Sequence, residues 1–287
     1  MKDKKKVLLS VLRKQLTKDY QYETQAIELV VKKLDGARDD GWGVIYSKSG
    51  KRLIAAKKTL EGHYVVKEDT TEINDKAFWG CAFVERIELP QTITKIGDEA
   101  FARCLSLDEV NIPSSVKELG KNPFEGLDAE VIRNESDAFV LENGLLLDAT
   151  HTRLIACLTD TETITLPETV QTVGSLSFTR RAKLKQVVLP EGLIRIGRDA
   201  FSDCEAMEEV TIPASVTTIE PYAFASCDSL RRVVFCGVPH HVARTAFSEC
   251  DNLTTILVPA DGKQRLRKQL HLASDSETVV FVDVKNK

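Results

Sequence analysis

The chain has 287 residues, of which 43% are apolar, 29% charged and 6% aromatic, and its formal net charge is −4. This is the composition of a folded protein. The weak negative charge argues against a nucleic-acid partner, because binding to phosphates needs clustered Lys and Arg. No segment approaches the length of a membrane span, so we expect no membrane-spanning helix.

The N-terminal segment, residues 1–37, is predicted to form a helical cap. Within residues 7–34, apolar side chains at Ile27, Val30, Val31 and Leu34 fit one buried stripe of a helix. A solenoid end exposes strand edges and core, and a cap covers both. A helix that binds a partner is the alternative role for this segment.

A phenylalanine recurs at a fixed interval, and this interval organises the rest of the chain. The first series ends at Phe124 and the second starts at Phe178; together they comprise Phe78, Phe101, Phe124, Phe178, Phe201, Phe224 and Phe247. A unit as short as the one between successive Phe residues cannot bury its own apolar face and is stable only against its neighbours. The sequence therefore predicts a solenoid.

Each turn contains a short strand with one buried face. Ile87 and Leu89 are separated by a single residue, as are Val110 and Ile112, so both pairs are predicted to point inward. A proline then ends each strand. Two further core positions lie between this proline and the Phe: Ile93 with Ile96, and Val116 with Leu119.

Two β-hairpins interrupt the turns. Residues 43–56, GVIYSKSGKRLIAA, recur without a gap as residues 144–157, GLLLDATHTRLIAC. His151 stands where Gly50 stands, which favours a turn residue over a catalytic imidazole. About three turns follow the first hairpin and four follow the second, as an internal duplication would produce.

The strand positions at Arg133 and Ile164 lie little more than one repeat apart, so we expect the stack to continue through the second hairpin. Residues 38–260 then form the solenoid. Residues 261–287 form a C-terminal cap, with a short helix in DGKQRLRKQL and a final strand in TVVFVDV.

Cysteines and histidines are the candidate metal ligands, and the cysteine count is odd. The seven are Cys81, Cys104, Cys157, Cys204, Cys227, Cys236 and Cys250. All except Cys157 and Cys236 stand at the same short spacing after a repeat Phe, a position that Leu127 and Arg181 take in other turns. Exchange with Leu favours small buried side chains. A zinc site on stacked cysteines and a metal at His240 and His241 are the alternatives, but no CxxC pair or nearby His completes a tetrahedral set. We predict no cofactor.

The phrases LPQTITKIGDEAFARC and LPEGLIRIGRDAFSDC resemble the BspA-type leucine-rich repeat: an apolar strand ending in Pro, an Ile-Gly pair, Ala-Phe, and a Cys shortly after the Phe. The resemblance covers roughly residues 43–260 and includes the hairpins. It implies a curved, right-handed solenoid with a parallel sheet on its concave side and short helical or 3-10 turns on the other. It also implies a bacterial or protist surface protein that binds other molecules.

Function is predicted to lie on the outward side chains of the parallel sheet. These run Glu88, Asn111, Thr165, Val188, Thr211, Val234 and Leu257, and about nine strands at ~4.8 Å give a face on the order of 40 Å long. These outward side chains change from polar to apolar toward the C-terminus. Exposed aliphatic residues with a polar rim indicate a recognition surface. The candidate face comprises Gln186, Val188, Glu209, Thr211, Arg232, Val234 and Leu257.

We therefore predict a non-enzymatic binding module whose partner is a protein. No phosphate-binding, dinucleotide, HExxH or GxSxG motif is present. A structural or adhesive protein with diffuse binding is one alternative. An enzyme is the other, and would need a deep pocket lined by His63, His240 or carboxylates.

Location follows from the first residues as they stand. The apolar run VLLSVL is interrupted by Arg13 and Lys14 and is shorter than a secretory signal core, which predicts a cytoplasmic protein. The family resemblance predicts the cell surface instead.

Overall fold

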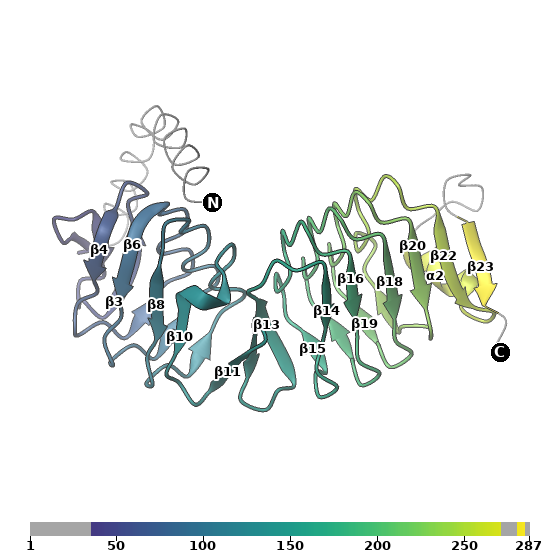
Figure 1. Cartoon of the computed structure of the whole chain (residues 1–287), viewed down its shortest axis with the longest axis horizontal. Helices are drawn as coiled ribbons and strands as arrows, with labels where there is room; N and C mark the ends of the chain where they lie inside the picture. The colour runs from purple at the N-terminus through teal and green to yellow at the C-terminus, as the bar shows by residue number, and fades with distance from the viewer. Residues whose placement is uncertain (1–35, 271–279, 285–287) are drawn as a thin grey trace. The chain divides into compact units, whose positions relative to one another are not determined.

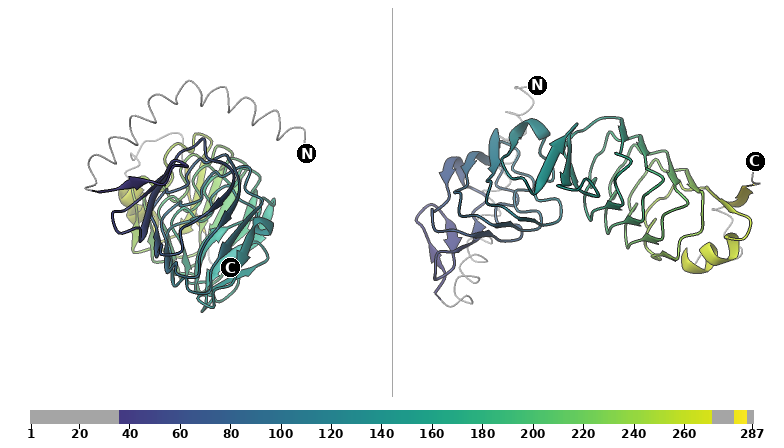
Figure 2. Two further views of the ribbon diagram at one scale, coloured as in Figure 1. Left: turned by 90° about the vertical axis from the view of Figure 1, so that its left-hand side faces the viewer. Right: turned by 90° about the horizontal axis from the view of Figure 1, so that it is seen from below.

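A computed structural model describes residues 36–270 and 280–284. The chain divides after Phe139 into two compact units. In each unit the backbone winds as a β-solenoid, and most turns contribute one strand to each of two parallel sheets, called here the first and the second sheet of that unit. Figures 1 and 2 show the turns of each unit stacked one behind another, with little helix.

The first unit contains a four-stranded and a six-stranded sheet. The first sheet has the order β10-β8-β6-β4 and is parallel throughout. Its strands are β4 (Glu61–Val65), β6 (Phe83–Glu88), β8 (Glu109–Ile112) and β10 (Ile132–Asn134), the last preceded by a 3-10 helix, η1 (Ala129–Val131). The second sheet runs β1 (Arg38–Asp39), β2 (Val44–Tyr46), β3 (Arg52–Ala56), β5 (Glu72–Ile73), β7 (Lys95–Ile96) and β9 (Glu118–Leu119).

The second unit repeats this plan with more turns. Its first sheet comprises two ladders, β14 (Thr163–Thr165) with β16 (Gln186–Val188), and then β18 (Glu209–Ile212), β20 (Arg232–Phe235), β22 (Thr255–Pro259) and β23 (Val280–Val284). Its second sheet runs β11 (Phe139–Glu142), β12 (Leu145–Asp148), β13 (Arg153–Cys157), β15 (Thr172–Val173), β17 (Arg195–Ile196), β19 (Thr218–Ile219) and β21 (His241–Val242). The helix α2 (Lys263–Leu270) follows β22.

The two predicted hairpins are confirmed, and each begins the parallel part of its second sheet. Strands β2 and β3 are antiparallel, as are β12 and β13, and both pairs contain a register shift at the same place. The second strand of each hairpin then pairs in parallel with the next turn. Gly50 and His151 occupy matching turn positions, with φ of 74° and 57°. The duplication read from the sequence therefore extends to the strand pairing.

The repeat phenylalanines form the centre of each unit. Phe101 is fully buried, and its ring stacks on Phe78 at 5.3 Å and on Phe124 at 5.6 Å between centroids. In the second unit Phe201 stacks on Phe178 at 4.6 Å and on Phe224 at 5.0 Å. One ring per turn, placed directly on the ring of the preceding turn, fixes the register of the stack.

The arc that carries each Phe is a series of turns, and this corrects the expectation of helices or 3-10 turns there. The backbone is left-handed on both sides of the Phe, with φ of 53° at Asp199 and 58° at Asp203 around Phe201. A helix needs consecutive right-handed residues, so these positions prevent one. Within the described residues the one 3-10 helix, η1, lies outside these arcs.

Two further expectations are corrected. Ile132, and not Arg133, takes the inward strand position, because Ile132 pairs with Val110 while Arg133 pairs with the outward Asn111. The predicted continuous stack is also not found in the strand pairing, since each unit has its own sheets. The first sheet of each unit is therefore described by itself.

The predicted caps have different outcomes. The N-terminal helix falls in residues 1–35, outside the described residues. The C-terminal helix and strand are present: Leu266 and Leu270 of α2 are buried, and β23 adds to the first sheet in parallel with β22.

Candidate interaction faces

The predicted alternation of inward and outward side chains is confirmed on the first sheets of both units. All inward positions expected from the sequence are buried, including Ile87, Val110, Val187 and Val233, with the exception of Arg133. The residues between them are exposed or half-buried. Any binding chemistry on these sheets therefore belongs to the variable outward positions.

The candidate face of the second unit is largely exposed, but it is less apolar than expected. Gln186, Glu209, Thr211 and Arg232 are exposed, and Glu209 forms an ion pair with Arg232 at 3.4 Å. Val188 is 43% exposed. The other two predicted residues, Val234 and Leu257, are half-buried. The apolar centre is thus Val188, with threonines on the neighbouring strands.

The first unit presents a charged face built from paired side chains. Glu88 on β6 accepts contacts from His63 at 3.1 Å and from Arg86 at 3.2 Å, and Arg86 also approaches Glu109 at 4.0 Å. Arg133 contacts Glu135 at 3.3 Å. A shallow hollow is lined by Arg86, Ile87, Glu88, Leu89, Glu109, Asn111, Arg133 and Glu135. The charges on this face largely neutralise one another.

One outward apolar position in the first unit was missed by the sequence reading. Val65 on β4 pairs with Glu88 and is 54% exposed. It lies between the buried Tyr64 and Val66, so the alternation used for the later turns would have identified it. The change from polar to apolar along the chain is therefore not a steady trend.

The cysteines that follow the repeat Phe have a structural role beyond filling space. The thiols of Cys104 and Cys204 donate to the carbonyl oxygens of Phe78 and Phe178 in the preceding turns, at 3.2 and 3.3 Å. Burial raises the pKa of both thiols. The buried Arg181 stands in the same position and donates to the carbonyl of Cys157. A Cys or Arg at this position thus ties its turn to the one before it.

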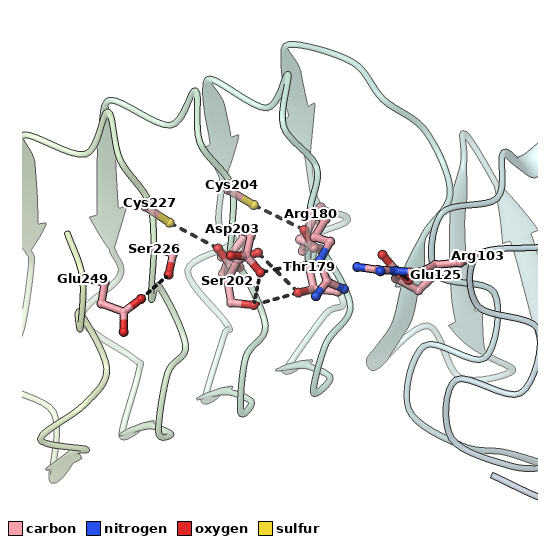
Figure 3. A network of polar contacts seen from close by, with 12 residues as sticks. Arg103, Glu125, Thr179, Arg180, Ser202, Asp203, Cys204, Ser226, Cys227 and Glu249 are labelled. Atoms are coloured by element: carbon pink, nitrogen blue, oxygen red, sulfur yellow. Dashed lines mark hydrogen bonds and ion pairs between the residues drawn. The ribbon is translucent and has the colours of Figure 1, made fainter. Parts of the chain in front are cut away.

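Polar side-chain contacts also link neighbouring turns. In the second unit the hydroxyl groups of Thr179 and Ser202 are 2.7 Å apart, and Ser226 contacts Glu249 at 3.1 Å (Figure 3). In the first unit Arg103 lies 3.7 Å from the buried Glu125. These contacts join one turn to the next, which is the pattern of stack stabilisation.

The described residues contain no cluster of three or more His, Cys, Asp or Glu that could hold a metal. His240 is exposed, and its carbonyl oxygen accepts hydrogen bonds from Arg265 and Gln269. His151 lies 3.2 Å from Glu142 at its hairpin turn. The geometry thus offers no support for the zinc and histidine alternatives. No helix in the described part of the chain has the length and apolar character needed to cross a membrane.

Solved structures with the same fold come from bacterial proteins. A leucine rich cell surface protein from Faecalibacterium prausnitzii is 19% identical, with a TM-score of 0.55 over 72% of this chain and 62% of its own. A leucine-rich repeat protein from Eubacterium ventriosum is 24% identical, with a TM-score of 0.58 over 72% and 63%. The pneumococcal vaccine antigen PcpA is 19% identical, with a TM-score of 0.57 over 86% and 73%.

The present chain therefore spans less than two thirds of the first two of these proteins. A comparison with curated protein sequences found no match. The model of the BspA type leucine rich repeat region matches residues 65–151 and 154–269 in six copies. With the period, the hairpins and the stacked Phe core, this match places the chain in the BspA-type leucine-rich repeat family.

Proposed function

We propose that this protein is a non-enzymatic binding module and that the first sheet of its second unit contacts a protein partner. The observation that carries the proposal is the 43% exposure of Val188 on an otherwise polar strand surface. Gln186, Thr211 and Glu209 provide a polar rim around it. An apolar centre with a hydrogen-bonding rim is the usual arrangement of a protein interface.

The charged face of the first unit is less suited to this role. A partner that covered it would have to remove water from Glu88, His63 and Arg86, which already contact one another. The desolvation of such pairs offsets most of the electrostatic gain. Covering Val188 instead removes apolar area from water at about 25 cal/mol per Å².

The handedness of the winding, the caps and the cellular location of the protein are also proposed. We propose a right-handed winding with the first sheet on the concave side, an N-terminal helical cap over residues 1–37, a repeat region over residues 38–260 and a C-terminal cap over residues 261–287. We also propose a position at the bacterial cell surface, which the similarity to a leucine rich cell surface protein from Faecalibacterium prausnitzii supports. Surface biotinylation of intact cells tests the location.

A structural or adhesive role with diffuse binding is the second candidate. It is favoured by exposed apolar side chains outside the candidate face, namely Trp42 at 71% and Val65 at 54%. In that case no single patch would dominate binding, and substitutions on the second unit would have no larger effect than equal substitutions on the first.

The test is capture of partners from bacterial envelope and host-cell extracts with the purified full chain as bait, followed by a direct affinity measurement on the captured protein. Val188→Lys with Val234→Lys should weaken binding at least about tenfold, the loss of more than one buried contact. Val65→Lys is the control, because it replaces an exposed valine by lysine on the first sheet of the first unit. Equal affinity in all three proteins contradicts the proposal.

A further inference from the structure

A backbone hydrogen bond joins successive turns just before β8, β16, β20 and β22 of the first sheets. In the second unit the Lys185 N–H donates to the Glu162 carbonyl at 2.8 Å, and the Arg231 N–H donates to the Glu208 carbonyl at 2.9 Å. The Thr254 N–H donates to the Arg231 carbonyl at 3.1 Å. The same bond recurs in the first unit between Asp108 and Glu85, at 2.8 Å.

Among the described turns of the second unit, this bond is missing at one step. The Glu208 N–H does not donate to the Lys185 carbonyl, and β16 and β18 belong to different ladders although they are neighbours in Figure 1. A hollow lies at this step, lined by Lys185, Gln186, Val187, Glu208, Glu209 and Thr211. The sheet is thus open beside Gln186, Glu209 and Thr211 of the candidate face.

The hollow has an excess of negative charge. Lys185 is engaged by Glu162 at 3.0 Å, and Glu209 is engaged by Arg232 at 3.4 Å. Glu208 is exposed and has no ion-pair partner among the described residues. A cationic group is therefore the complement of this hollow.

We infer that the hollow between β16 and β18 receives an arginine side chain of the protein partner. This inference rests on the proposed function, since it assigns a chemistry to part of the same face. A guanidinium is planar and has five N–H donors in a fork, so it can contact the Glu208 carboxylate and the Lys185 carbonyl together. Its aliphatic stem can lie against Gln186 and Thr211, which line the hollow.

The probe for this inference is a set of acetylated, amidated pentapeptides, Thr-Val-X-Val-Thr, in which X is arginine, lysine, norleucine or glutamate. Titration of the 15N-labelled full chain by NMR should give saturable shifts at the amides of residues 185–188 and 208–211 with the arginine peptide. Binding of the arginine peptide should be at least about tenfold tighter than that of the norleucine peptide, as expected for charge-assisted hydrogen bonds.

Glu208→Gln should abolish most of this difference, and thermal denaturation should be unchanged because Glu208 is exposed. The matched control is Asp108→Asn, at the equivalent place in the first unit, where the backbone bond to the Glu85 carbonyl is intact. Arginine and norleucine peptides of equal affinity, shifts elsewhere, or wild-type binding by Glu208→Gln would overturn the inference. A lysine peptide that binds as tightly as the arginine peptide would overturn the fork geometry.

Failure of this inference is distinguishable from failure of the proposed function. If the captured protein still depends on Val188 and Val234 while the arginine peptide does not bind, the face is correct and its chemistry is wrong. If the captured protein is insensitive to both valines, the proposed function itself fails.

Discussion

The two units share one plan and differ mainly in what they present to solvent. Each starts with the same bulged hairpin and continues with parallel strands around a column of Phe rings. On the first sheet, however, one unit has Glu88 joined to His63 and Arg86, whereas the other has Val188 among threonines. The two units thus share the pattern of their inward residues and differ at their outward positions.

The largest effects are expected in the part that the units share. Phe101→Ala and Phe201→Ala each remove a fully buried ring that stacks on two others, and each should cost about 3–5 kcal/mol of stability. Hydrogen exchange with mass spectrometry should show the loss of protection in the mutated unit alone. Equal loss in both units would show that they unfold as one, and the comparison of two units would need revision.

A smaller effect is expected at the cysteine position of the first turn after the second hairpin. Arg181→Ala removes a buried guanidinium and leaves the Cys157 carbonyl without that donor, at a cost of about 2–3 kcal/mol. Arg181→Cys should recover part of this cost, because the thiol of Cys81, at the same position after the first hairpin, donates to the Lys57 carbonyl. Urea denaturation measures both. If the Cys and Ala variants are equally destabilised, a hydrogen bond from residue 181 does not contribute to the stability of this turn.

The thiol bonds can be tested directly. Cys204→Ala loses the bond to the Phe178 carbonyl and a buried sulfur, and should cost about 1 kcal/mol. Cys236 is exposed, so Cys236→Ala serves as the control and should leave the denaturation midpoint unchanged. Alkylation by iodoacetamide should reach Cys236 well before Cys204. Fast alkylation of Cys204 in the folded protein would contradict its place in the core.

The smallest expected effect is a pH dependence of stability that only the second of the two hairpins should show. Burial would raise the pKa of Asp148, but hydrogen bonds from the Arg153 and Thr152 N–H groups and from nearby hydroxyl groups lower it below its ordinary value. A lowered folded-state pKa stabilises the protein above the unfolded pKa of about 4, and this contribution is lost as the pH falls through the folded value.

The second unit should therefore lose some stability through Asp148 as the pH falls below about 4. Asp148→Asn should flatten this part of the stability curve measured by denaturation at each pH. The first hairpin has Ser47 at the equivalent place, where its hydroxyl accepts from the Arg52 N–H and does not titrate. An unchanged curve in Asp148→Asn would show that the carboxylate is not responsible.

Much of the fold was readable from the sequence because the repeat imposes the same physical demand at a fixed interval. Phe201 and its equivalents, the inward strand pairs and both hairpins were predicted from spacing. The turn conformation beside each Phe was not, since left-handed backbone at Asp199 and Asp203 leaves no signal as clear as glycine would. Arg133 was misplaced because η1 interrupts the regular count just before its strand.

The candidate face was predicted only in outline. Alternation identified which residues point outward, but the half-burial of Val234 depends on the packing of neighbouring strands. The hollow between β16 and β18 depends on one missing backbone bond, which side-chain patterns do not encode. The thiol bonds to Phe carbonyls were likewise hidden, because exchange of Cys with Leu suggests packing alone.

The most direct test of the central claim is a hydrogen-exchange footprint of the full chain with its captured protein partner. The account predicts protection at β16, β18 and β20 of the second unit, with β6 and β8 of the first unit unchanged. Protection confined to the first unit, or spread equally over both, would contradict the assignment of binding to the second unit.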